Sequence, residues 1–109
     1  MKLVVAVIQN QDEAALLNAL SDAGFQATKL ASTGGFLRQG NTTVLVGVEE
    51  EKVETVLNLV RQTCRSRRQL VTPLASLGRV EPAYFTEPVE VPVGGATVFV
   101  VDVERFLKA

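Results

Sequence analysis

A residue pattern that predicts the order strand, helix, strand occurs twice in this chain of 109 residues, and the second occurrence follows the first by 40 residues. With that shift, apolar positions of the first unit fall on apolar positions of the second: Val4 on Val44, Leu16 on Val56, Leu17 on Leu57, and Leu20 on Val60. Two successive β-α-β units of this length predict a ferredoxin-like βαββαβ sandwich, which is an α+β fold.

The two expected helices carry signals at their ends. In the first, "NQDEAALLNALSDAGF", Asp12 is expected as the N-cap and Gly24 as the residue just past the C-terminus. The second, "EEEKVETVLNLVRQTC", begins with three glutamates and ends beside arginines, which complements the helix dipole at both termini. Its buried stripe is expected to contain Val53, Val56, Leu57 and Val60.

The first strand is expected at Leu3 to Ile8, because a continuous run rich in β-branched residues is typical of a central strand buried on both faces. Further strands are expected at residues 25–32, 42–48 and 96–103. Residues 89–93 alternate valine with other residues ahead of Gly94-Gly95, which predicts a hairpin between this stretch and the last strand. Pro92 limits the first arm of that hairpin to an edge position.

A segment of 24 residues, from Arg65 to Pro88, separates the second helix from this hairpin. It contains Pro73, Pro82 and Gly78. Because a compact domain seldom carries so long a loop without a role, the segment is a candidate for function.

Composition excludes several classes of function. The net charge is −1, so the whole chain has no electrostatic preference for nucleic-acid polymers or membranes. The local basic cluster "RQTCRSRRQ" is better explained as a solvated helix C-terminus than as a phosphate patch. The N-terminal apolar run of six residues is too short for a signal peptide or a membrane span, which favours a soluble cytoplasmic protein.

Catalytic machinery is sparse. The sequence has no histidine, and its single cysteine, Cys64, can form neither an intrachain disulfide nor a Cys-x-x-Cys site. A small buried hydrophobe is the favoured interpretation of Cys64, ahead of a redox sensor. A helix N-terminus explains Glu49, Glu50 and Glu51 better than a metal site does. No catalytic residue and no metal ligand is therefore assigned, and the protein is not expected to be an enzyme.

The stretch "TGGFLRQGN" is neither a Walker A motif nor a GxGxxG fingerprint. Gly34-Gly35 allows successive backbone N–H groups to converge on an anion, and Phe36 offers a flat face for a nucleobase. Lys29 and Arg38 offer positive charge near a phosphate. A plain hairpin turn with a buried Phe fits the pattern equally well, so the residues alone leave both interpretations open.

Three stretches, "ATKLASTGGFLRQGNTT", "QTCRSRRQLVTP" and "PVEVPVGGATVFVVDVERF", resemble the PII-like cyclic di-AMP receptor family of bacteria, and the resemblance covers essentially the whole chain. It implies a single PII-like domain over residues 1–109, with a short T-loop at about 33–41 and a long B-loop at about 65–88. It also implies a homotrimer that binds cyclic di-AMP in clefts between subunits. Binding would change the conformation of the loops and regulate an unidentified partner protein.

The resemblance places ligand-binding residues at Gln26, Thr28, Gly35, Phe36, Leu37, Asn41 and Gly47. By the same resemblance, Phe36 packs on an adenine, while Asn41 and the backbone near Gly47 bind base edges. Thr28 and the amides of Gly35 and Phe36 contact phosphate or polar adenine atoms.

The chain departs from the family pattern just ahead of this loop. Gly24-Phe25-Gln26 stands where well-known relatives read Asn-Phe-Arg, so Gln26 keeps hydrogen bonding but lacks a charge-assisted contact. One alternative is therefore a PII-like sensor whose pocket has shifted to another adenine nucleotide. A second is a ligand-independent trimeric interaction module that binds a partner through the long loop, with Tyr84 and Phe85 as contacts.

Overall fold

The computed structural model describes residues 1–31, 40–71 and 88–109. Along the chain its elements are β1 (Lys2–Gln9), η1 (Asn10–Asp12), α1 (Glu13–Asp22), β2 (Ala27–Ala31), β3 (Asn41–Val48), η2 (Glu50–Lys52), α2 (Val53–Thr63), β4 (Arg67–Val71), β5 (Val89–Val93) and β6 (Ala96–Asp102). The elements η1 and η2 are single 3₁₀ turns that lead into the two α-helices.

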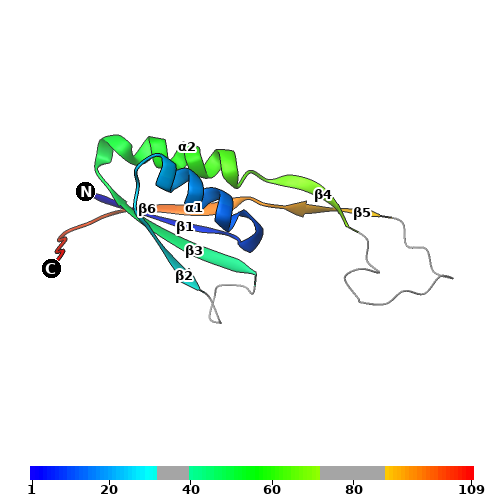
Figure 1. Cartoon of the computed structure of the whole chain (residues 1–109), viewed down its shortest axis with the longest axis horizontal. Helices are drawn as coiled ribbons and strands as arrows, with labels where there is room; N and C mark the ends of the chain where they lie inside the picture. The colour runs from blue at the N-terminus through cyan, green and yellow to red at the C-terminus, as the bar shows by residue number, and fades with distance from the viewer. Residues whose placement is uncertain (32–39, 72–87) are drawn as a thin grey trace.

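A four-stranded antiparallel sheet forms the body, in the order β2-β3-β1-β6. Both helices pack on one face of this sheet (Figure 1). β1 and β3 belong to successive units of the sequence repeat and lie side by side, with Val4 opposite Val46 and Ala6 opposite Val44. The α+β, ferredoxin-like sandwich expected from the repeat is confirmed.

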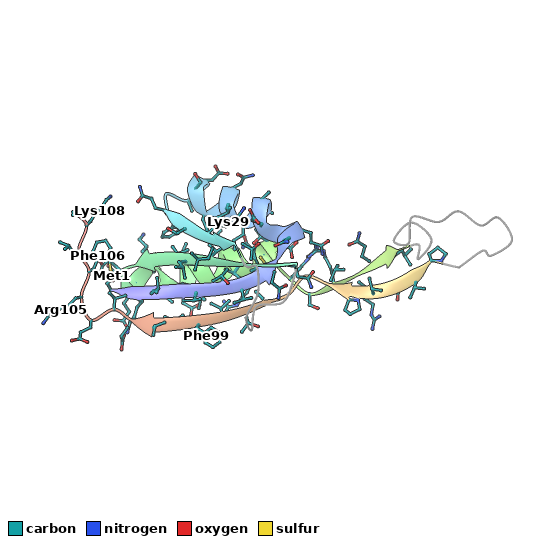
Figure 2. The ribbon with its side chains drawn as sticks, turned by 90° about the horizontal axis from the view of Figure 1, so that it is seen from below. Met1, Lys29, Phe99, Arg105, Phe106 and Lys108 are labelled. Atoms are coloured by element: carbon teal, nitrogen blue, oxygen red, sulfur yellow. The ribbon has the colours of Figure 1, made fainter. Side chains whose placement is uncertain are left out.

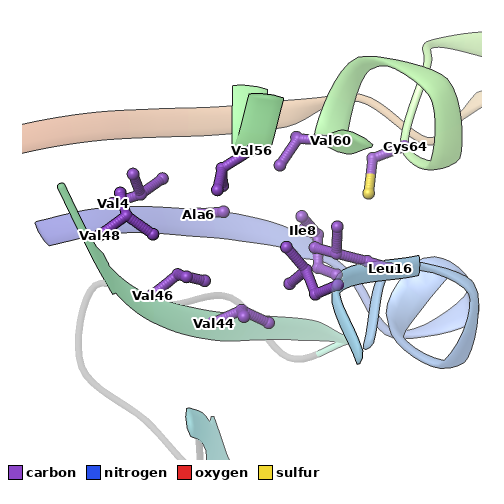
Figure 3. Packing of buried hydrophobic residues seen from close by; sticks show 11 residues of the cluster. Val4, Ala6, Ile8, Leu16, Val44, Val46, Val48, Val56, Val60 and Cys64 are labelled. Carbon is purple, nitrogen blue, oxygen red and sulfur yellow. The ribbon is translucent and has the colours of Figure 1, made fainter. Parts of the chain in front are cut away.

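The core lies between the helices and the sheet (Figure 3). Alternate residues of β1 and β3 point toward the helices and meet Leu16 and Leu20 of α1 and Val56 and Val60 of α2. Burial of each such side chain contributes about 1.5–3 kcal/mol of hydrophobic stabilisation. The helical stripes expected from the sequence are confirmed, with Val53 and Leu57 half-buried at the margin of the core.

β1 is central, but the prediction that both of its faces are buried is wrong for the single chain. Val4, Ala6 and Ile8 are buried, whereas Val5 and Val7 on the other face are only half-buried. In the part of the chain that the structure describes, no helix covers that second face. We call it the open face; its residues include Thr28, Leu30, Leu3, Val5, Val7, Leu45, Gly47, Phe99 and Val101.

Both ends of α1 lie at the predicted residues, but only the C-terminal end makes the capping hydrogen bonds. Gly24 has a φ of 88°, its amide donates to the carbonyl of Ser21, and the Phe25 amide donates to the carbonyl of Leu20. These two bonds form a Schellman motif, which glycine favours because it adopts positive φ without strain. Asp12 is the N-cap residue, as expected, but its side chain makes no capping bond and instead pairs with Arg67.

The expected hairpin across Gly94-Gly95 is also wrong. β5 pairs with β4, in the register Arg67↔Val93 to Val71↔Val89, and β6 pairs with β1. We call this two-stranded ribbon the β4–β5 arm; it projects from the body along the long axis of the molecule (Figure 1). Part of the segment expected as a long loop is therefore strand. Pro92 does lie in an edge strand, as expected.

Two glycines connect β5 of the arm to β6 of the sheet. Gly94 and Gly95 have φ values of 78° and 87°, which turn the chain between β5 and β6. The Gly95 amide donates to the Cys64 carbonyl over 2.5 Å, and the Gly94 amide donates to Oε1 of Gln9 over 2.7 Å. These bonds hold the base of the arm against the end of α2 and the end of β1.

Candidate functional site

Four of the site residues expected from the sequence lie in the described part of the chain: Gln26, Thr28, Asn41 and Gly47. The other three, Gly35, Phe36 and Leu37, lie outside the described residues, so their predicted roles stay predictions. The four described residues form two groups, one at each end of β3.

The first group surrounds the start of β2. Thr28 pairs with Leu45 and Ala27 pairs with Val46, so Gln26 and Thr28 lie beside the end of β3 that carries Gly47. Gln26 and Thr28 are exposed and line a cavity of about 540 Å³, together with Phe25 and Leu17. Hydroxyl and amide groups above an apolar floor suit a ligand that has both polar edges and a flat apolar face.

Among the residues that the structure describes, Gly47 has no neighbour that requires a glycine. A Cβ atom built at this position meets no heavy atom of residues 1–31, 40–71 or 88–109 within 4 Å, and its φ is not in the left-handed region. A glycine inside a strand costs stability and often marks a place where another backbone or a ligand comes close. The space above Gly47, which the described residues leave open, is therefore a candidate place for a ligand or a neighbouring subunit.

The second group surrounds Asn41, the first residue of β3. Asn41 lies directly opposite Gln9 of β1 and borders two hollows, of about 360 Å³ and 230 Å³. Gln11 and Pro92 also line the larger hollow, and Gly94 and Thr97 the smaller. Side-chain amides offer a donor and an acceptor together, which is the pattern needed to bind the edge of a base.

The two groups are far apart in one chain. Asn41 and Gly47 lie at opposite ends of β3, and a rise of about 3.3–3.4 Å per residue separates them by roughly 20 Å. The structure therefore brings Gln26, Thr28 and Gly47 together and leaves Asn41 with Gln9 and the base of the arm.

Between the two groups runs the open face, which is largely apolar. Thr28, Leu45, Val5 and Phe99 form one row across the four strands. Phe99 is 57% exposed and lies on the open face, opposite Val5 in the register; Figure 2 labels it beside β6. Leu30 and Val101 extend the same exposed apolar surface.

Charged residues near the site are paired in ways that the sequence did not reveal. Lys29, expected as a possible phosphate partner, lies 2.6 Å from Oε1 of Glu13. Its ammonium group, followed by the Thr42 hydroxyl, lowers the pKa of Glu13 below the ordinary value of 4.5. Arg67 pairs with Asp12 across 2.9 Å, and Arg61 lies 3.5 Å from Glu54. The basic cluster is thus divided among separate partners.

Cys64 is buried, with 1% of its surface exposed, and burial raises the pKa of its thiol. This confirms the interpretation of Cys64 as a small core residue. In residues 1–31, 40–71 and 88–109, no group of three or more His, Cys, Asp and Glu side chains could hold a metal ion. Neither described helix is long and apolar enough to cross a membrane.

Comparison with known proteins places this geometry in a family. A crystal structure of a functionally unknown protein from Pediococcus pentosaceus is 39% identical and has a TM-score of 0.78, covering 99% of this chain and 96% of that one. The family model described as "Cyclic-di-AMP receptor" matches residues 1–109, which is the whole chain. Membership supports a binding role in cyclic di-AMP signalling. The chain belongs to the cyclic di-AMP receptor family.

Proposed function

We propose that this protein is a non-enzymatic, cytoplasmic sensor that binds cyclic di-AMP in clefts between the subunits of a homotrimer. Ligand binding changes the conformation of the T-loop (about 33–41) and the B-loop (about 65–88) of the single domain 1–109, and thereby regulates a partner protein. The pocket-lining residues are Gln26, Thr28, Gly35, Phe36, Leu37, Asn41 and Gly47. Family membership supports the choice of ligand.

The separation of the two residue groups is the observation that carries this proposal. Asn41 and Gly47 occupy opposite ends of β3, so one small ligand cannot contact both within a single chain. In a closed ring of subunits, one end of each chain meets the other end of its neighbour. Each cleft then receives Thr28 and Gly47 from one subunit and Asn41 from the next, and a trimer has three such clefts.

The open face supports the assembly itself. Phe99 and Val101 on β6 and Leu30 on β2 are each exposed by nearly half or more in the single chain. Soluble monomers rarely leave a contiguous apolar surface of this kind uncovered. Packing of three open faces around a common axis would bury it.

Calorimetric titration of the purified protein tests the proposal. Cyclic di-AMP is titrated in parallel with cyclic di-GMP, ATP and AMP, and the mass of the free protein is measured by sedimentation equilibrium. We expect a trimer that binds one cyclic di-AMP per subunit. Absence of heat with cyclic di-AMP at high micromolar concentration would remove the ligand assignment.

Phe36→Ala is the residue-specific control for stacking. Loss of base stacking costs about 1–3 kcal/mol, which corresponds to roughly 5- to 150-fold weaker binding. An unchanged affinity would show that Phe36 does not pack on the ligand. The melting temperature of the ligand-free variant should match that of the parent protein.

A second candidate ligand follows from Gln26. This side chain is exposed in the first group and brings no positive charge to the cavity that it lines. Another adenine nucleotide would then be the preferred ligand. A thermal-shift screen of nucleotides separates the two candidates, because a ligand raises the melting temperature by binding the native state. Gln26→Arg should increase affinity for cyclic di-AMP if the missing charge is the cause.

A further inference from the structure

We propose that the short segment from Gln9 to Glu13, which we call the junction turn, couples the two parts of the chain that border the site. It ties the start of β3, where the proposed T-loop ends, to the base of the β4–β5 arm. Asp12 is its central positioning residue. This inference rests on the proposed function only where it concerns ligand affinity.

On one side, the junction turn holds the start of β3. The Asn10 amide donates to the Gly40 carbonyl over 2.8 Å. The buried Thr42 hydroxyl lies 2.5 Å from Oδ1 of Asn10 and 3.0 Å from Oε2 of Glu13. Glu13 in turn pairs with Lys29 of β2, so both strands that flank the proposed T-loop are attached to the turn.

On the other side, the same turn holds both strands of the arm at their base. The Asp12 carboxylate is 4% exposed and receives two contacts from the Arg67 guanidinium, at 2.9 Å and 3.5 Å. Oε1 of Gln9 accepts the amide of Gly94 over 2.7 Å. Arg67 begins β4, and Gly94 directly follows β5.

A hollow of about 360 Å³ lies between the two attachments, lined by Gly40 and Asn41 on one side and by Pro92 and Val93 on the other. The junction turn supplies the remaining lining residues, Gln9 and Gln11. The junction turn therefore connects the two sides of this hollow, the start of β3 and the base of the arm. Gln9 and Asp12 bind the arm, whereas Asn10 and Glu13 bind the strands on the other side. Because these residues lie within one short turn, one attachment cannot shift far without straining the other.

Because the Asp12 carboxylate is buried, a partial separation of Asp12 from Arg67 is unfavourable. A buried carboxylate that loses its cation is left uncompensated, which strongly destabilises the displaced arrangement. The arm base is thus favoured in one position relative to the turn. A ligand or partner that moves either attachment must act against both, and this links the two borders of the site.

Hydrogen exchange on the full-length, ligand-free protein tests the coupling directly. Asp12→Asn removes the charge but keeps the side-chain shape, and Gln9→Met removes the acceptor for Gly94 while leaving Asp12 intact. Asp102→Asn is the matched control, because Asp102 forms an exposed pair with Lys2 at the far end of the sheet. The observed amides are those of the arm, of Asn10 and of residues 41–43.

We expect each junction variant to speed exchange by about tenfold in the arm and also at Asn10 and the start of β3, whereas Asp102→Asn leaves both regions unchanged. Faster exchange confined to the arm overturns the coupling. If Asp12→Asn fails to fold, the same two outcomes are read from Gln9→Met.

Calorimetry with cyclic di-AMP then separates this inference from the proposed function. Asp12 touches no predicted ligand position, and we expect Asp12→Asn to weaken binding by about tenfold at an unchanged stoichiometry. If the parent protein binds no cyclic di-AMP, the proposed function fails and the exchange data alone decide the coupling. If the parent binds and both affinity and exchange are unchanged in the variant, the coupling is wrong.

Discussion

Gly47 shows how a single residue can be unfavourable for the isolated chain and still be retained. It lies inside β3 with an ordinary backbone conformation, and the described part of the chain leaves free space where a side chain would be. Folding therefore loses conformational entropy at this position without a gain in packing. We expect a ligand or a second subunit to fill this space.

Gly47→Ala should leave the ligand-free fold intact and stabilise it by up to about 0.5–1 kcal/mol, while weakening cyclic di-AMP binding. Denaturant unfolding and calorimetry measure the two effects. Gly24→Ala is the matched control, because its surroundings are equally open but its φ of 88° strains any other residue. Equal destabilisation by the two substitutions would contradict this account of Gly47.

Glu13 predicts an acid-dependent contribution to stability. Pairing with Lys29 and Thr42 lowers its pKa in the folded protein below the ordinary value of 4.5. The unfolded chain therefore binds the proton more readily than the folded chain does. The stabilisation is fully present above about pH 4.5 and is lost as the pH falls through the lowered pKa.

Carboxyl NMR of Glu13 and unfolding measurements across the acid range check this prediction. Glu13→Gln should flatten the loss of stability in that window, and Lys29→Gln should move the Glu13 pKa back toward 4.5. A Glu13 carboxyl that titrates at or above 4.5 in the parent protein would be inconsistent with the observed pairing.

At the scale of elements, the connection from the β4–β5 arm to β6 depends on a single residue, Gly94. Gly94 has a φ of 78°, and a Cβ atom there would collide with the Arg65 carbonyl oxygen and the Arg67 guanidinium. The backbone amide of the same residue is bound by Gln9. The chain after β5 therefore approaches the start of β4 and the residues just before it more closely than any side chain at this position would allow.

Gly94→Ala should destabilise the protein by more than the roughly 1–3 kcal/mol expected from a strained conformation alone. Gly95→Ala is the matched control: its φ is similar at 87°, but the nearest heavy atom to an added Cβ is 3.9 Å away, on Ser66. Chemical unfolding of both variants isolates the contribution of the collision. If the two variants lose the same stability, the close approach at Gly94 is not important.

Local signals in the sequence were sufficient for the elements whose partners are set by the repeat. The apolar pattern of Val4 and Val44 and the glycine after α1 predicted the sheet, the helices and the Schellman end correctly. The partner of β5 could not be predicted in this way, because alternating valines suit any neighbouring strand. Its choice depends on contacts between distant residues, Asp12 with Arg67 and Gln9 with Gly94.

The candidate site, like the fold, could be predicted from the sequence only in part. Gln26, Thr28, Asn41 and Gly47 were expected from resemblance, and the structure adds that they lie in two separate groups. The junction turn was missed because an aspartate before a helix gives the same sequence signal whether it caps the helix or pairs elsewhere. Only the position of Arg67 distinguishes the two roles.

At the scale of the whole molecule, the two faces of the sheet differ in a way that a lone chain does not explain. Helices bury one face, and the other displays Phe99, 57% exposed, within a row that reaches Thr28. A side chain so exposed contributes little to the fold of its own chain. Its apolar area becomes useful when subunits associate.

Phe99→Asp should therefore convert the proposed trimer to monomers without unfolding the chain. Sedimentation equilibrium reports the mass, and circular dichroism reports the fold. Val100→Asp is the control, since Val100 is the next residue of β6, lies on the helix side and is 44% exposed. A Phe99→Asp protein that remains trimeric would place the subunit contact elsewhere.

The β4–β5 arm has a further consequence for how such a chain can diverge. In the described residues β4 and β5 pair only with each other, and the four-stranded sheet is complete without them. Adding or deleting one cross-strand pair at a time would shift side chains between faces, whereas changes in steps of two would preserve them. Relatives can thus lengthen or shorten their reach in increments of about 7 Å while the body keeps its packing. The span of the arm and the stability of the body can evolve, or be engineered, as separate traits.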